Sequence, residues 1–171
     1  GSSGYVEPND PADYRAAIDN GRLRLHYFVD QTDLKPPQPY QWVNPRQWRA
    51  TDVIVDVRID PLDTYVTTPS GFSYRLSEQV GGKQTSGYHV LITSSSITLF
   101  AGKVLLAAAP APPDALPHDY RAVAVGDEHC VYRDGALIMS AHDATYREGF
   151  VGVQTYYAVA YFDNFGVARH P

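Results

Sequence analysis

Apolar and polar residues alternate along most of this chain. The clearest stretch is 52–60, where every second residue is aliphatic and most of those between them are charged. The same alternation follows the turn dipeptide Asn20-Gly21, where Leu23, Leu25 and Tyr27 are separated by Arg or His. Successive side chains of a β-strand point to opposite faces, so this period of two predicts strands with one buried face.

The alternation predicts about eleven short strands, several of them separated by turn dipeptides such as Asp134-Gly135. Their expected ranges are 22–29, 52–60, 71–78, 87–93, 96–100, 103–108, 119–125, 128–133, 136–141, 150–155 and 157–167. Residues 10–17, where Pro11 follows a capping Asp10, predict no more than a single helical turn. Because no convincing helix separates the strands, we expect antiparallel sheets packed face to face as a β-sandwich.

We expect one all-β domain over residues 1–171. A length of 171 residues suits one domain with its own core, and the composition shows no break that would divide the chain. The opening residues 1–4, Gly-Ser-Ser-Gly, are interpreted as a cloning remnant. Residues 5–19 are interpreted as an N-terminal extension of the domain.

Composition and charge narrow the function classes. The thirteen Tyr, thirteen Gly and thirteen Pro favour pleated sheet punctuated by turns. The net charge of −5, without a basic run, argues against a nucleic-acid partner. The longest apolar stretch, 103–110, is much shorter than the roughly 18 residues of a spanning helix, so we expect no membrane insertion. Cys130 is the only cysteine, which excludes an internal disulfide, and we expect its side chain to be buried.

Three motifs in the C-terminal part of the chain occur in a characteristic order. They are Tyr132-Arg133-Asp134-Gly135, Gly149-Phe150-Val151-Gly152 and Phe162-Asp163-Asn164-Phe165. This order resembles concanavalin A-like jelly-roll domains, which include laminin-G-like, carbohydrate-binding and 3-keto-disaccharide hydrolase-type domains. The resemblance implies a jelly-roll sandwich, an extracellular or cell-envelope location, and a place within a larger multidomain protein. It implies no single function, because this fold hosts lectins, hydrolases, lyases and spacers.

The resemblance also implies a structural calcium ion. Many similar domains hold a cation at the sheet edge with an Asp of the closing strand and oxygens near the first strand, which indicates Asp163 with Asp19 and Asn20. Carboxylate and amide oxygens suit calcium. The alternative is that Asp163 and Asn164 only hydrogen-bond to neighbouring backbone within an irregular closing strand.

Aromatic residues beside amides indicate a sugar platform. Both tryptophans lie in a polar, proline-rich segment, 36–48, and two adjacent tyrosines follow a glutamine near the C-terminus. A flat aromatic ring suits the apolar face of a sugar, and amides suit its hydroxyl rim. The stacking candidates are Tyr40, Trp42, Trp48, Tyr156 and Tyr157, and the hydroxyl partners are Gln41, Arg46 and Gln154. The alternative is core packing of these aromatic residues beneath a loop.

The favoured function is therefore a non-catalytic carbohydrate-binding module with a carbohydrate ligand. One alternative is a glycoside hydrolase, but Asp52 and Asp56 would lie about 13 Å apart along one strand, from a rise of ~3.3 Å per residue. That distance is too long for a catalytic pair, and Arg58 indicates charge pairing on a solvated face instead. A polysaccharide lyase is the other enzymatic alternative, with His89, Tyr88, Arg75 and Tyr74 as its candidate catalytic group. A spacer or protein-interaction domain is the third possibility.

Overall fold

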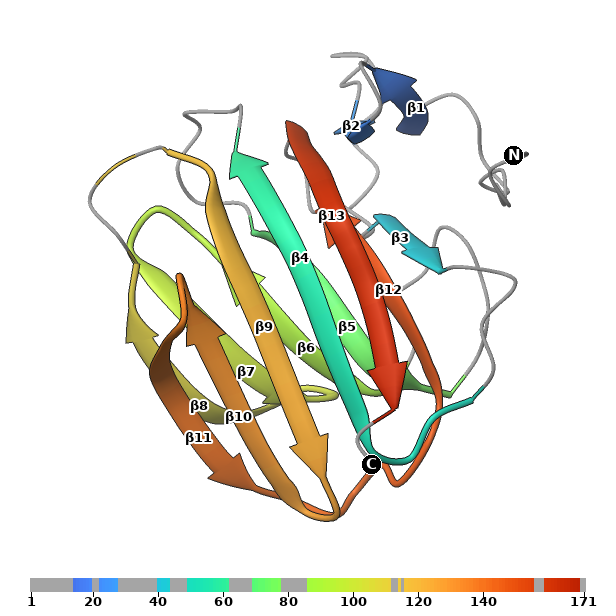
Figure 1. Ribbon diagram of the computed structural model, residues 1–171, viewed down its shortest axis with the longest axis vertical. Coiled ribbons are helices and arrows are strands. Elements are labelled where there is room, and N and C mark those ends of the chain that lie inside the picture. The colour runs from blue at the N-terminus through green and yellow to red at the C-terminus, as the bar shows by residue number, and fades with distance from the viewer. Residues whose placement is uncertain are drawn as a thin grey trace.

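Two antiparallel sheets face each other across an apolar core in the computed structural model (Figure 1). The structure describes residues 14–19, 22–27, 40–43, 49–61, 69–77, 86–111, 114, 116–155 and 159–169. Of the strands in these ranges, seven form sheet A and six form sheet B. The predicted antiparallel β-sandwich is confirmed.

Both sheets combine hairpins of consecutive strands with pairs of strands that are far apart in the sequence. Sheet A has the spatial order β1 (Tyr14–Asp19), β2 (Arg22–Tyr27), β13 (Val159–Arg169), β4 (Val53–Pro61), β9 (His118–Val125), β10 (Glu128–Arg133) and β11 (Ala136–His142). Sheet B has the order β3 (Tyr40–Val43), β12 (Phe150–Thr155), β5 (Ser70–Leu76), β6 (Tyr88–Ile92), β7 (Ser96–Ala101) and β8 (Val104–Pro110). The last strands of the chain, β12 and β13, therefore lie inside different sheets and complete both layers.

Every strand predicted from the alternation is present, with ends that differ by no more than two residues. Two strands were not predicted, β1 and β3. The helical turn expected over residues 10–17 is wrong from Tyr14 onward, because this segment pairs with β2 as an antiparallel hairpin, Tyr14 opposite Tyr27. Cross-strand pairing outweighs the local capping signal there. Residues 10–13 lie outside the described ranges.

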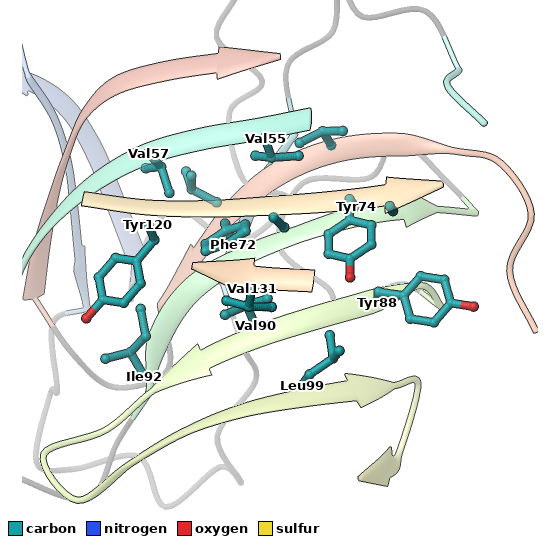
Figure 2. Close-up of a cluster of buried hydrophobic side chains, with 14 of the residues drawn as sticks. Val55, Val57, Phe72, Tyr74, Tyr88, Val90, Ile92, Leu99, Tyr120 and Val131 are labelled. Carbon is teal, nitrogen blue, oxygen red and sulfur yellow. The ribbon is translucent and has the colours of Figure 1, made fainter. Parts of the chain in front are cut away.

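Alternate residues of both sheets form one shared core (Figure 2). Val55 and Val57 of β4 point from sheet A toward Phe72 of β5 and Val90 of β6 in sheet B. These side chains are almost completely buried. Burial of aliphatic and aromatic area is the main favourable term in the free energy of folding.

The alternation corrects the expectation for Cys130. Its neighbours in β10, His129 and Val131, are both buried, so the intervening Cys130 points to the outer face of sheet A and is half-buried. The prediction of a buried thiol was therefore wrong.

The register shifts at four places in the described strands, and two of these shifts lie beside a non-glycine residue with a positive φ. In β13 the register with β4 shifts between Asp163 and Gly166, and Asn164 has a φ of 50°. This confirms the irregularity expected in the closing strand. In β5 the register with β12 shifts beside Arg75, which also has a φ of 50°. Each bulge adds one residue to its strand and turns the side chains that follow.

The close approach of β5 and β6 generates a stability prediction. A Cβ atom at Gly71 would overlap the backbone carbonyl oxygen of Val90, whereas one at Gly166 of β13 would meet its nearest atom at 3.9 Å. We expect Gly71→Ala to lower the free energy of unfolding by about 3 kcal/mol. The control Gly166→Ala should change it by about 0.5 kcal/mol or less. Urea denaturation of both variants measures the difference, and equal midpoints would contradict the close approach.

Candidate functional site

The candidate site is the outer face of sheet B, the side turned away from sheet A. Because Phe72, Tyr88, Val90, Ile97, Leu99 and Val153 point into the core, the residues between them point outward. The outward residues that form the candidate site are Gln154 of β12, Ser73 of β5, His89 and Leu91 of β6, and Thr98 and Phe100 of β7.

Strand register brings these residues into two rows. In one row Gln154 lies opposite Gly71, which lies opposite Leu91, and Leu91 lies opposite Thr98. In the other row Gly152 lies opposite Ser73, Ser73 opposite His89, and His89 opposite Phe100. Four strands therefore contribute side chains to one continuous surface.

Polar side chains on this face are unusually well buried. Ser73 and His89 are 0% exposed and Gln154 is 2% exposed, although all three lie on the face away from the core. The Ser73 Oγ lies 2.8 Å from the His89 Nδ1 as a hydrogen bond. Burying a polar group costs free energy unless it is hydrogen-bonded, so a sheet that served only for packing would carry apolar residues here.

Exposure rises across the face toward β7. Leu91, Thr98 and Phe100 are half-buried, whereas the polar residues of β5, β6 and β12 are buried. An amide, a hydroxyl and an imidazole therefore border a partly open surface that contains an aromatic ring. This combination can hydrogen-bond to hydroxyl groups and contact apolar C–H groups at the same time.

The register of β3 with β12 places two of the predicted stacking positions away from this face. Gln41 of β3 lies opposite Gln154, so its position belongs to the outer face of sheet B. The positions of these two predicted hydroxyl partners are therefore adjacent. Tyr40 and Trp42 lie opposite Thr155 and Val153, which places their positions on the core side of the sheet. Arg46, Trp48, Tyr156 and Tyr157 lie outside the described residues. Stacking by these aromatic residues stays a prediction.

The proposed lyase group is not brought together on one surface. Tyr74 and Tyr88 stack in the core with ring centroids 5.3 Å apart, whereas His89 lies on the opposite face of the same sheet. All four members, including Arg75, are no more than 1% exposed. The structure therefore keeps Tyr74, Tyr88 and Arg75 together, with the Arg75 Cζ 5.9 Å from the Tyr88 ring centroid, and separates only His89 from them.

The buried imidazole that does meet the two tyrosines is His129 of β10. The Tyr74 hydroxyl donates to His129 Nδ1 at 3.1 Å, and His129 Nε2–H donates to the Asp143 carbonyl oxygen at 2.9 Å. Both ring nitrogens are thus satisfied by a neutral imidazole. The ring lies 4.1 Å from that of Tyr88, centroid to centroid, which completes a buried aromatic cluster.

These tyrosines remain protonated at neutral pH. Burial, followed by the hydrogen bond to Asp143, raises the pKa of Tyr88 to about 12. Burial also raises the pKa of Tyr74 far above its usual value. The Tyr88 hydroxyl donates to Asp143 Oδ1 at 2.7 Å, and this bond and the Thr145 N–H outweigh burial and lower the pKa of Asp143. A phenol held in this way supports packing and is poorly suited to accept a proton.

Arg75 has a structural set of partners. Its Nε–H donates to the Thr51 carbonyl oxygen at 2.7 Å, and its Nη1 donates to those of Gly126 at 2.8 Å and Tyr146 at 3.2 Å. Asp52 Oδ1 lies 3.6 Å from Nη2. The guanidinium therefore ties sheet B to segments at the end of sheet A.

The carboxylates of sheet A form the solvated charge pairs that the sequence predicts. Asp56 accepts two hydrogen bonds from Arg121, at 2.6 and 3.1 Å, and Arg58 donates to Asp119 at 3.0 Å. The partners come from β4 and β9, so the pairing runs across strands and not along one strand. These carboxylates are engaged with cations and do not form a catalytic pair.

The calcium site at Asp163, Asp19 and Asn20 stays a prediction. Asp163 Oδ1 accepts the backbone N–H of Asn164 at 2.8 Å, as the alternative interpretation expects. Asp19 ends β1, and β2 separates β1 from β13, so Asp19 and Asp163 are not on adjacent strands. Asn20 lies outside the described residues, among which no group of three or more metal-ligating side chains occurs.

Ser73, Thr98 and Phe100 were not singled out from the sequence. The alternation does place Thr98 and Phe100 on one face of their strand and Ile97 and Leu99 on the other. Which face meets the second sheet depends on packing between segments far apart in the chain, so no local signal marks these three residues as outward.

Comparison with solved structures identifies the fold. The carbohydrate-binding module CBM66 from Bacillus subtilis superposes with a TM-score of 0.75 at 17% identity, covering 96% of this chain and 95% of the module. A protein with a galectin-like fold, also from B. subtilis, has a TM-score of 0.71 at 13% identity, over 92% of this chain and 86% of that one. A GlcNAcα1-4Gal-releasing endo-β-galactosidase from Clostridium perfringens has a TM-score of 0.56 at 12% identity, over 99% of this chain and 53% of the enzyme.

The chain thus has the concanavalin A-like jelly-roll fold that its C-terminal motifs resemble. Proteins of this fold include both carbohydrate-binding and glycoside-cleaving members, so a carbohydrate-related role is compatible with the fold without being specified by it. No family model and no curated protein matches the chain. Within the described ranges, no helix has the length and hydrophobicity that crossing a bilayer requires.

The buried His129 generates a pH prediction. Burial, reinforced by the nearby Arg75 charge, lowers the pKa of His129 below its usual 6.5. The unfolded chain therefore takes up a proton that the native imidazole does not, so acid favours unfolding. We expect the contribution of the neutral His129 to the free energy of unfolding to be complete above about pH 7. It should decline as the pH falls below about 6.5.

The measurement is the free energy of unfolding by urea between pH 5 and 7.5. His129→Gln should flatten the decline toward acid, whereas the matched change at the exposed His142, His142→Gln, should leave it intact. An unchanged slope in His129→Gln would show that other groups cause the pH dependence.

Proposed function

We propose that this chain is a carbohydrate-binding domain that holds a saccharide on the outer face of sheet B and does not cleave it. The observation that supports this proposal best is the half-buried group of Leu91, Thr98 and Phe100 on a face turned away from the core, bordered by the buried polar side chains Ser73, His89 and Gln154. Groups of this kind are retained where a ligand or a specific network needs them.

The chemistry of the face matches that of a sugar ring. Each pyranose or furanose presents C–H groups on its faces and hydroxyl groups at its rim. The half-buried Phe100 and Leu91 offer apolar contact, and the hydroxyl of the half-buried Thr98 can donate and accept hydrogen bonds. The carbohydrate-binding module with the same fold is consistent with this assignment.

The distribution of acids favours binding over hydrolysis. Glycoside hydrolysis usually requires two carboxyl groups at a short separation. The six described strands of sheet B contain neither Asp nor Glu. In sheet A, Asp56 and Asp119 are paired with arginines across the strands. The strands therefore supply no acid–base pair to the proposed binding face.

The aromatic positions predicted from the sequence extend the same proposal. Tyr156 follows Gln154 by two residues, and Gln41 lies opposite Gln154 on the outer face. Tyr156 and Tyr157 are therefore proposed to stack on a sugar at the β12 edge of the site. Trp42, whose position belongs to the core side, is the weaker stacking candidate.

The test is affinity gel electrophoresis on a panel of soluble polysaccharides. We expect Phe100→Ala to weaken retardation by about tenfold in apparent dissociation constant, because it removes an aromatic contact to the sugar. The matched control is Tyr132→Ala, which removes a half-buried ring from the outer face of sheet A. Its retardation should equal that of the unmodified chain.

Equal losses in both variants would contradict a site on sheet B. Reducing-end detection on the same panel separates binding from cleavage. Retardation without release of new reducing ends supports a binding domain, whereas release that survives exhaustive purification would favour the glycoside hydrolase alternative.

A further inference from the structure

We infer that the outer face of sheet B selects uncharged saccharides and rejects uronate-containing or sulfated ones. This inference rests on the proposed function and specifies its ligand class. It is drawn from the distribution of cationic side chains between the described strands of the two sheets. Saccharide binding in general does not depend on that distribution.

The charged residues of the described strands are segregated. All Asp, Glu and Arg residues of these strands belong to sheet A, with the single exception of Arg75 in β5. Lys occurs in none of the described strands. The outward rows of sheet B consist of amide, hydroxyl, imidazole, aliphatic and aromatic groups.

Arg75 cannot serve as the missing cation. Its side chain is 1% exposed and lies at the end of the sandwich, where three carbonyl oxygens and Asp52 engage the guanidinium. Redirecting it to a ligand would leave the carbonyl oxygens of Thr51, Gly126 and Tyr146 without this donor. Such a change costs more than an anionic group on the sugar could return.

An anionic saccharide on this face would therefore meet no available cation from the described strands. Carboxylates and sulfates are recognised by Arg or Lys, which supply charge-assisted hydrogen bonds. Neutral hydroxyl and amide groups do not replace the hydration of an ion, whereas they do replace the hydration of a sugar hydroxyl. The net charge of −5 adds a weak repulsion of polyanions at low salt.

The experiment compares neutral with anionic polysaccharides at pH 8, where ordinary imidazoles are uncharged. The neutral probes are β-glucan, galactomannan, arabinoxylan and galactan, and the anionic probes are alginate, polygalacturonate and dextran sulfate. Affinity gel electrophoresis is run at low and at physiological salt. We expect retardation by at least one neutral probe and by no anionic probe at either salt concentration.

A charge-insertion pair tests whether the selection arises at this face. Thr98→Lys places a cation on the outer face of sheet B, and Ser140→Lys places the same charge on the exposed outer face of sheet A. Thr98→Lys should raise affinity for alginate or polygalacturonate by about tenfold relative to Ser140→Lys. Circular dichroism and urea midpoints confirm that both variants are folded.

The outcomes distinguish this inference about ligand class from the proposal that the domain binds carbohydrate. Retardation of the unmodified chain by anionic probes at physiological salt would overturn the inference while leaving carbohydrate binding intact. Equal gains in Thr98→Lys and Ser140→Lys would also overturn it, since the charge would then act without regard to the face. Retardation by none of the seven probes would overturn both the inference and the proposed function.

Discussion

The buried guanidinium of Arg75 joins the two sheets at one end of the sandwich, and the course of β5 depends on it. It donates to carbonyl oxygens from the segment before β4, the β9–β10 turn and the segment before β12. A buried cation is tolerated only where its N–H groups find acceptors. These three segments therefore have to converge on Arg75. The residue itself adopts a φ of 50°, an unfavourable backbone conformation that such a network can maintain.

The bulge at Arg75 in turn determines what the outer face of sheet B contains. Phe72 and Tyr74 of β5 point into the core, so Ser73 points outward and meets His89 of β6. Past the bulge the register of β5 with β12 shifts, and Leu76 lies opposite Phe150. A network at the end of the core thus maintains the alignment of a polar surface on the opposite side of the sheet. The proposed binding face and the hydrophobic core are consequences of the same alternation.

The long alternating segments made most of this fold predictable, and the errors have physical causes. β3 was missed because its four residues follow a proline-rich stretch, and it is a strand only through pairing with β12. The site was harder to predict than the fold. His89 and Tyr88 were grouped because they are adjacent in sequence, yet adjacent residues of a strand point to opposite faces. Phe100 is a large apolar residue, which the sequence alone would place in the core. Only the position of sheet A relative to sheet B shows that it faces outward.

Fold likeness alone leaves binding and cleavage equally open, because both occur among proteins of this fold. In the proposed function, the distribution of charge between the sheets is what favours binding over cleavage. In sheet A the acids meet arginines across strands, as Asp56 does with Arg121, which suits a solvated surface. In sheet B the outward rows of the described strands contain hydrogen-bonding groups and no Asp or Glu, which suits the proposed contact with a hydroxylated ring. This distribution is the basis of the proposal that the face recognises a saccharide, and the scarcity of cations on the described strands of sheet B is the basis of the proposed ligand class.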